Sequence, residues 1–490
     1  MAYCGYVTTL KNVRKHSNAD RLQLADCFGN TICVNLDYYE GQKVVYFPTD
    51  GQLSEEFCEY NNLVRKKDEN GNNIGGYMDP DKRNVKCIKL RGETSDGLVL
   101  PMRCLDFCFE DGNADAHLAV GDTIDTVNGH PICKKYIPRS NKRNGGKEGN
   151  KSRKRKAPLA PLFAEHADTS QLAYNVGDFK PGDEIEITLK VHGTSQRTGY
   201  LPVFNGYSDS FWCRLVNGVK SKFVKNYEPY HDGEPIYDWG VVSGTRHTVL
   251  DNYDGGFYGS NEFRKQYHDY FDGKLWKGET VYYEVAGFTH TGAPIMAVCN
   301  NKKVEDKKFQ KRYGDTTTFS YGCDPNGIKA GEIFKFETNP VNDKEGRLIM
   351  APQSRIFVYR MTMTNEDGNV VEYTPGFMRY RCEQMGVDCV PVFEKFTIGD
   401  IRICSNDELE TYTISPEDVI KIAEEYYDGP DPIDPSHIRE GVVVRILNRP
   451  KFTAYKHKND LFKCISGIAV EQIAESGMAD EMDEDILSEL

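Results

Sequence analysis

Lys190 is the residue whose type and setting in this sequence most favour covalent chemistry. It follows an alternating, strand-like run and opens the lysine-valine-histidine-glycine sequence that ends at Gly193. A lysine is nucleophilic only when its amine is neutral, and an ordinary pKa of about 10.4 leaves little neutral amine at pH 7. Burial or nearby cations must therefore lower the pKa before Lys190 can attack an electrophile.

Two further lysines could supply those cations. Lys456 and Lys458 stand two positions apart in a segment that we expect to be a strand, so their side chains point to the same face. If this strand lies beside Lys190, its ammonium groups lower the pKa of Lys190 and hold a phosphate of a nucleotide. Glu284 and Glu440 supply carboxylates for a ribose hydroxyl and for a divalent metal ion.

These residues belong to five segments that follow one another in a fixed order. A lysine-x-x-glycine sequence alone is common, whereas five ordered segments are specific. Gly193 has no side chain, which permits close approach of the backbone to a phosphate or a sugar. The segments are Lys190–Gly193, Val242–Arg246, Tyr282–Gly287, Arg439–Arg445 and Tyr455–Asn459.

The five segments together resemble the covalent nucleotidyltransferase superfamily, which contains ATP-dependent polynucleotide ligases and mRNA capping enzymes. His192 stands where DNA ligases usually carry aspartate, which is similar to the RNA ligases. The isoleucine-threonine-leucine run before Lys190, the serine-glycine-threonine-arginine element ending at Arg246 and the barrel-like N-terminal region resemble the RNA ligase 5 family. Members of that family seal nicks and carry an OB domain ahead of the catalytic domain.

This resemblance implies a reaction and a role for each matched residue. Lys190 attacks the α-phosphorus of ATP and carries AMP, which passes to a 5′-phosphate before a 3′-hydroxyl displaces it. Glu440 holds Mg²⁺ or Mn²⁺, and Phe357 stacks on adenine, with Tyr359 as the alternative. The implied nucleotide-binding residues are His192, Gly193, Arg246, Glu284, Phe357, Lys456 and Lys458.

A second group of basic residues is expected to contact nucleic acid. Arg197 could reach a phosphate, and a structural role is its alternative. Residues 136–157 are strongly basic and lack apolar periodicity, which predicts a flexible linker near nucleic acid or a solubilising tether. The linker residues proposed for this contact are Lys151, Arg153 and Lys154.

The predicted fold class is α+β, with antiparallel sheets flanked by helices in the catalytic domain. Residues 1–135 have the short alternating runs of a small β-barrel, and His16–Leu22 resembles a signature of OB-fold tRNA-binding modules. We expect an OB-fold-like nucleic-acid-binding domain at 1–135, the linker, an adenylyltransferase domain at 158–470 and an acidic segment at 471–490. Within the catalytic domain, Pro416–Tyr427 is predicted to be a helix that Ser415 begins.

Composition limits the compartment and the partners. The chain has no apolar run of the roughly 18 residues that a membrane span needs. Its 15 scattered cysteines favour reduced thiols, so we expect a cytoplasmic protein, of a bacterium or a bacteriophage, without a membrane partner. The net charge of −13 restricts nucleic-acid binding to local basic patches. The expected partner is an RNA or RNA/DNA duplex with a nick, bound by a monomer.

Two other functions stay open at this level. A capping guanylyltransferase would use the same lysine chemistry with GTP, although few residues follow Asn459 to form the C-terminal OB domain of capping enzymes. A non-catalytic RNA-binding protein would keep the fold with a degenerate pocket. The sequence does not decide whether either strand at the nick is RNA or DNA, nor what residues 288–354 contribute.

Overall fold

The computed structural model describes residues 3–67, 74–136, 157–167, 169–224, 227, 229–254, 260–296, 311, 317–322, 338–342, 348–405 and 408–466. The acidic segment at 471–490 and almost all of the predicted linker, with Lys151, Arg153 and Lys154, lie outside these residues. So does most of the region 288–354. Among the described helices, none is long and apolar enough to cross a membrane.

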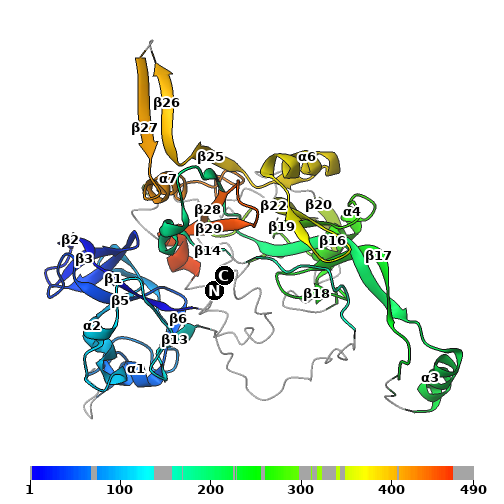
Figure 1. The fold of residues 1–490 in the computed structure, drawn as a ribbon, viewed down its shortest axis with the longest axis horizontal. Coiled ribbons are helices and arrows are strands. Elements are labelled where there is room, and N and C mark those ends of the chain that lie inside the picture. The colour runs from blue at the N-terminus through cyan, green and yellow to red at the C-terminus, as the bar shows by residue number, and fades with distance from the viewer. Residues whose placement is uncertain are drawn as a thin grey trace.

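The N-terminal unit, residues 3–136, is built mainly from short strands, coloured blue to cyan in Figure 1. Its elements are β1 (Gly5–Thr9), β2 (Lys11–Lys15), β3 (Leu22–Cys27), β4 (Asn30–Asn35), β5 (Lys43–Phe47), β6 (Gly51–Leu53), α1 (Glu55–Tyr60), β7 (Cys87–Leu90), β8 (Glu93–Asp96), β9 (Leu98–Pro101), the 3₁₀ helix η1 (Met102–Cys108), α2 (Ala114–His117), β10 (Thr123–Ile124), β11 (Thr126–Val127), β12 (His130–Pro131) and β13 (Cys133–Lys135).

Two apolar clusters hold this unit together, one on each side of β5. Val45 and Phe47 enter the cluster that includes α1 and η1, whereas Val44 and Tyr46 point the other way into a second cluster with β3 and β4. Four strands pair in the order β10-β1-β5-β9, and three others pair in the order β2-β3-β4. The described strands form separate sheets, so the closed OB-type barrel that the sequence predicts is not confirmed.

The C-terminal unit contains a five-stranded sheet that carries several of the motif residues. Its order is β14-β29-β28-β15-β25, and its pairs are antiparallel apart from β14 with β29. Apolar side chains of β15 and β28 pack against Val419 and Ala423 of α7 on the outer face of this sheet. The elements are β14 (Ser170–Gln171), β15 (Glu184–Leu189), β25 (Val392–Thr397), α7 (Asp418–Tyr426), β28 (Gly441–Ile446) and β29 (Thr453–Lys458), with the short 3₁₀ helices η2 (Leu172–Tyr174) and η3 (Val176–Asp178) after β14.

A seven-stranded sheet forms the other half of this unit. Its strands follow the order β18-β17-β16-β19-β22-β23, with β24 paired to β22. Helices α4 and α6 cover its outer face, where Phe271 and Met385 pack against Tyr283 and Val358. The elements are β16 (Thr194–Tyr207), β17 (Pro235–Gly244), β18 (Val249–Leu250), α4 (Glu262–Phe271), β19 (Glu279–Ala286), β22 (Arg355–Thr364), β23 (Val370–Glu372), α6 (Pro375–Met385) and β24 (Asp388–Cys389).

These elements confirm the mixed α+β class, the strand-like run before Lys190 (β15) and the expected strand that carries Lys456 and Lys458 (β29). The predicted helix is also present as α7, although it begins at Asp418 rather than at Pro416. The backbone N–H and the hydroxyl of Ser415 both donate to Oδ2 of Asp418, at 3.0 and 2.7 Å, which fixes the entry to the helix.

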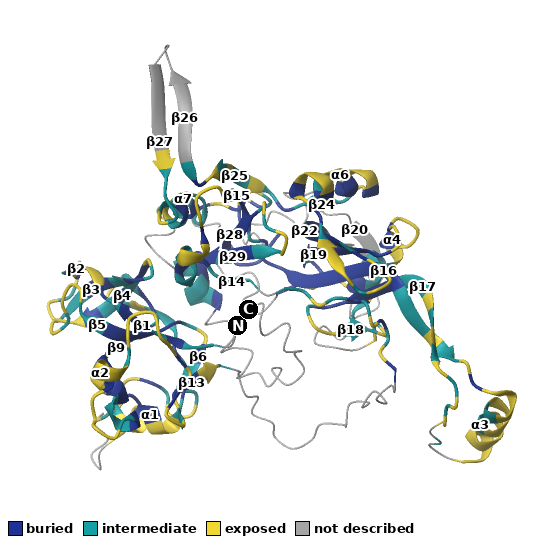
Figure 2. Cartoon of the chain, in the orientation of Figure 1, coloured by how far each residue is buried: buried dark blue, intermediate teal, exposed yellow. Residues whose placement is uncertain are grey.

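Three further features extend from or flank the two sheets. The hairpin of β26 (Gly399–Ser405) and β27 (Glu408–Ile414) projects from one side of the molecule, and α3 (Phe211–Phe223) stands at the end of the long strands β16 and β17 (Figure 1). Another hairpin joins β20 (Thr338–Asn342) to β21 (Leu348–Pro352). Figure 2 shows that the middle of the seven-stranded sheet is buried, whereas α3 is exposed.

Candidate nucleotide-binding site

Lys190 lies where the chain passes from one sheet to the other. Strand β15 ends at Leu189 in the five-stranded sheet, and β16 begins at Thr194 in the seven-stranded sheet. The backbone N–H of Lys190 donates to the carbonyl oxygen of Gly441 at 3.0 Å, so Lys190 stays fixed to the edge of β28. The crossing brings the lysine between the inner faces of the two sheets.

Gly193 makes this crossing possible, but its close approach is to protein rather than to a ligand. A side-chain carbon at Gly193 would lie 2.4 Å from the carbonyl oxygen of Val285 and 3.0 Å from Cγ of Glu284. Any larger residue would push β16 away from β19. The glycine of the motif therefore sets the distance between Lys190 and the strand that carries Glu284.

A buried carboxylate holds two of the motif lysines together. Oε1 of Glu440 lies 2.7 Å from Nζ of Lys190 and 3.2 Å from Nζ of Lys458. Burial by itself raises the pKa of Glu440, but the ammonium groups of Lys190 and Lys458 outweigh it and lower the pKa to about 2. Glu440 is thus the counter-ion of the lysine group at neutral pH.

The cationic cluster predicted from the sequence is present, with its clearest effect on Lys456. Burial lowers the pKa of Lys456, and the charges of Lys458, Lys190 and Arg246 lower it further, to about 7. The nearest charged neighbour of Lys190 is instead the Glu440 carboxylate. The activation of Lys190 by neighbouring cations stays a prediction.

Alternation along the strands creates a cavity between the two sheets. Glu186, Thr188 and Lys190 face inward, while Ile185 and Ile187 enter the core beneath α7. The cavity has an empty volume of about 980 Å³, part of which is open to solvent. Six basic and two acidic side chains line it, which are Lys190, Arg246, Arg379, Arg445, Lys456 and Lys458 with Glu186 and Glu284.

Of the two aromatic residues proposed to stack on adenine, Tyr359 lines this cavity and Phe357 does not. Phe357 is buried in an apolar cluster with Leu189 and Val191, whereas Tyr359 lines the cavity. A bulge between Tyr282 and Tyr283 leaves Tyr359 without a paired residue on β19. The Tyr359 hydroxyl lies 3.0 Å from that of Ser195. Of the two aromatic candidates, Tyr359 is placed to stack on a base.

His192 lies in the protein interior and is not among the residues that line the cavity. Its Nδ1 is 3.2 Å from Nε2 of His437, and its ring packs edge-on against Phe319 and Phe462. Burial lowers the pKa of His192 to about 4, so the ring is neutral at pH 7. In this arrangement His192 supports the loop that carries Lys190, and a contact with the leaving group stays a prediction.

Arg197 occupies a structural position instead of a surface for nucleic acid. It is 1% exposed, its guanidinium lies 4.5 Å from the Phe163 ring, and it donates to the carbonyl oxygens of Thr245 and Arg246. The expectation that Arg197 contacts nucleic acid does not fit this burial. Arg197 fixes the turn that brings Arg246 to the cavity.

Sequence reasoning missed Glu186 and Arg379, which also line the cavity. Arg379 and Lys395 both form ion pairs with Glu186, the latter at 3.0 Å. Since Glu186 lies an even number of residues before Lys190 on β15, strand alternation could have revealed it. Arg379 could not be found in this way, because α6 lies in another part of the sequence.

A second, larger cleft lies between the two units. It shares Thr169, Arg246, Lys456 and Lys458 with the cavity that Lys190 lines, and it has an empty volume of about 2820 Å³, part of which is open solvent. Its opposite wall comes from the N-terminal unit and includes Asp50, Lys86, Lys135 and Tyr136. Lys456 and Lys458 are therefore also reachable from the interdomain side.

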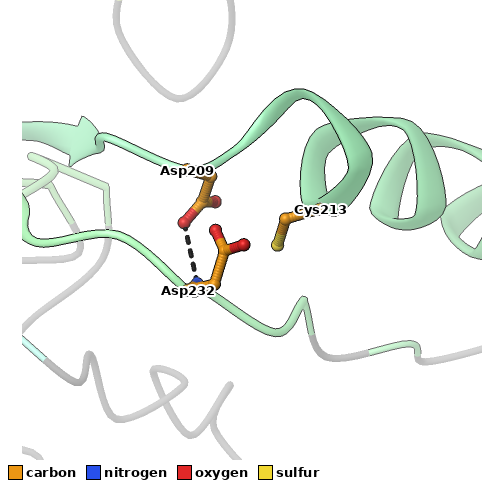
Figure 3. A group of neighbouring side chains, drawn as sticks. All are labelled: Asp209, Cys213 and Asp232. Atoms are coloured by element: carbon orange, nitrogen blue, oxygen red, sulfur yellow. Dashed lines mark hydrogen bonds between the residues drawn. The ribbon is translucent and has the colours of Figure 1, made fainter.

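One group of potential metal ligands occurs elsewhere among the described residues, near the start of α3 (Figure 3). Asp209 accepts hydrogen bonds from the backbone N–H groups of Asp232 and Gly233, both at 3.1 Å. Asp232 accepts from the Ser210 hydroxyl at 2.6 Å, and the Cys213 thiol donates to the carbonyl of Tyr230. These contacts tie α3 to the returning chain, so the group has a structural explanation.

Comparison with known proteins supports the fold. No protein-family model matches the chain, and no curated protein matches it. A solved structure of a glutamate-to-alanine variant of Naegleria gruberi RNA ligase, with ATP and Mn, is 14% identical. It matches 94% of this chain and 98% of its own, at a TM-score of 0.50.

The same Naegleria ligase with PPi covers 94% of this chain and 97% of its own, at 14% identity and a TM-score of 0.47. The first of these matches shows that the chain has the overall fold of an RNA ligase.

Proposed function

We propose that this protein is an ATP-dependent RNA ligase that joins a 3′-hydroxyl RNA end to a 5′-phosphate at a nick in a duplex. The observation that carries the proposal is the convergence of Lys190, Arg246, Glu284, Lys456 and Lys458 on one cavity between two sheets. The ligase fold and the neighbouring structure named with ATP and Mn support it. RNA/DNA hybrids are within the same proposal.

The proposed chemistry begins with Lys190. Its Nζ forms a bond to the α-phosphorus of ATP, the bond from that phosphorus to the bridging oxygen breaks, and pyrophosphate leaves. A 5′-phosphate oxygen then takes AMP from Lys190, and the 3′-hydroxyl displaces AMP to close the strand. Lys456 and Lys458 stabilise the negative charge that develops at phosphorus in each transfer.

A divalent ion fits the residues at this site. Mg²⁺ and Mn²⁺ prefer carboxylate and phosphate oxygens, and Mg²⁺ commonly uses one or two carboxylates together with substrate phosphates. Glu284 faces the cavity, whereas Oε1 of Glu440 is taken by Lys190 and Lys458. When bound, the ion would neutralise phosphate charge and Glu284 would help to hold it, whereas the coordination by Glu440 that the sequence resemblance implies stays a prediction.

Incubation of the full chain with ATP labelled at the α-phosphate tests the proposal. The wild-type protein should become labelled, Lys190→Ala should not, and Lys421→Ala should behave like the wild type because Lys421 is an exposed residue of α7. Sealing of a nicked RNA duplex should follow the same pattern. An unlabelled wild-type chain would refute the proposal.

Two alternatives give different results in the same experiment. Labelling from GTP in place of ATP, with transfer to a diphosphate RNA end, would indicate a capping guanylyltransferase. Tight RNA binding without any covalent nucleotide would indicate a non-catalytic RNA-binding protein. Nicks with RNA or DNA on each side of the break would define the substrate.

A further inference from the structure

Helix α3 presents its apolar side to solvent. Its apolar side chains are between 45% and 83% exposed, and they are Phe211, Trp212, Leu215, Val216, Val219 and Phe223. At 100° per residue these six positions cover roughly 140° of the helix circumference. No residue of α3 is buried. A soluble protein rarely exposes such a stripe without a partner.

The polar side of α3 is the side that faces the rest of the protein. Asn217 donates to the carbonyl oxygen of Tyr230 at 2.6 Å, and its side-chain oxygen accepts from the Tyr227 hydroxyl at 2.8 Å. Ser210 caps the helix by accepting from the N–H of Cys213. Together with the contacts in Figure 3, these hydrogen bonds hold the apolar side outward.

Charge indicates what kind of partner would cover this side. Helix α3 contains Arg214, Lys220 and Lys222 and has no acidic residue, so pairing with α3 of another copy would bring like charges together. The segment 471–490 of this chain has the opposite character, because it contains acids and no base. Four of its apolar residues recur at every fourth position, namely Met478, Met482, Ile486 and Leu490.

Distance favours another copy as the source of this segment. Strand β16 has 14 residues and leads from Ser195 at the cavity to the base of α3. At about 3.3 Å per residue that is roughly 40 Å. The described chain ends at Ser466, which lines the interdomain cleft near Lys458. The residues from there to Met478 span at most roughly 40 Å even when fully extended. The segment of the same copy would therefore reach α3 only with this part of the chain stretched out, whereas the segment of a second copy has no such constraint.

We infer that α3 is a docking surface for the acidic C-terminal segment of a second copy of this chain. Reciprocal docking makes a two-fold dimer, in which each copy offers one α3 and one C-terminal segment. Apolar side chains of the segment cover the stripe from Phe211 to Phe223, while its carboxylates pair with Lys220 and Lys222. This arrangement differs from the monomer that we expect from the sequence alone.

The oligomeric state of the full chain tests this inference. Sedimentation should give a dimer, and both removal of residues 471–490 and Val219→Asp should give a monomer. Val120→Asp is the matched control, since Val120 is an equally exposed valine of the N-terminal unit and should leave the dimer intact. A full chain that stays monomeric at every concentration tested would overturn the inference.

Trp212 provides a direct probe of the surface. A peptide of residues 471–490, added to the truncated chain, should shift the Trp212 fluorescence to shorter wavelength in a saturable way, and more weakly as salt rises. Trp212→Phe removes this signal and serves as the blank. No shift with the peptide would contradict the inference, as would a dimer that survives truncation but is lost in Val219→Asp, because α3 would then pair with itself.

Discussion

Lys463→Met should weaken the contact between the N-terminal unit and the catalytic unit by about 3–5 kcal/mol. Nζ of Lys463 lies 2.5 Å from Oδ2 of Asp96 on β8 and 3.3 Å from Oδ1 of Asp460. The Asp96 side chain is 3% exposed. Burial lowers the pKa of Lys463, but Asp96 and Asp460 outweigh it and raise the pKa well above its ordinary value, so the amine is charged at neutral pH.

The size of the effect follows from what each substitution leaves behind. Lys463→Met leaves the buried carboxylate of Asp96 without its cation, and removal of one partner of a buried ion pair typically costs about 3–5 kcal/mol. Asp96→Asn should cost less, because Lys463 keeps Asp460 and the side-chain oxygen of Asn30 at 3.4 Å. The double variant should recover part of the loss, since no unpaired charge remains at Asp96.

Urea unfolding of the four proteins, together with amide hydrogen exchange in β8 and in residues 460–466, measures this double-mutant cycle. Lys421→Met is the control, because it removes an exposed ion pair with Asp418 and should leave the stability nearly unchanged. If Lys463→Met were no more destabilising than Lys421→Met, the two units would not depend on this pair.

Two other substitutions probe the site itself. Gly193→Ala should destabilise the protein by about 1–3 kcal/mol in urea unfolding, because the new carbon would meet the backbone of Val285, whereas Gly376→Ala, which has open space in α6, should be neutral or stabilising. If the two variants changed stability equally, a close approach of Gly193 to the backbone of Val285 would be contradicted. Glu440 has its pKa lowered from 4.5 to about 2, so its contribution to stability is complete above pH 4.5 and is lost as the pH falls towards 2. Between pH 5 and pH 2.5 that loss is about 2 kcal/mol, and it should be absent in Glu440→Gln when unfolding is compared at these two pH values. Parallel pH profiles of the two proteins would contradict the ion-pair assignment.

Strand periodicity explains which parts of the site were predictable. Alternation of side chains placed Lys456 and Lys458 on one face of β29, and the structure puts both at the cavity. The same rule could not identify Glu440 as the partner of Lys190, because the two residues are far apart in the sequence and their contact depends on the pairing of β15 with β28.

Local irregularity explains what alternation could not resolve. Phe357 and Tyr359 stand two positions apart on β22, so the sequence leaves both as candidates for stacking. The bulge beside Tyr359 was not predicted from the sequence. In the structure Tyr359 lines the cavity and Phe357 does not. The exposed apolar side of α3 was missed for a different reason. An apolar stripe on a helix normally indicates contact with a core, not with solvent.

The charge balance at the cavity links nucleotide binding to protonation. Without a bound anion, Lys190 and Lys458 share the carboxylate of Glu440, and Lys456 reduces the remaining repulsion because its pKa of about 7 lets it lose its proton. A phosphate group bound among these lysines would add negative charge and raise the pKa of Lys456 again. Binding of a polyphosphate near pH 7 is therefore coupled to proton uptake by Lys456. The bound phosphate would then act as a second counter-ion of the three lysines, beside the carboxylate of Glu440.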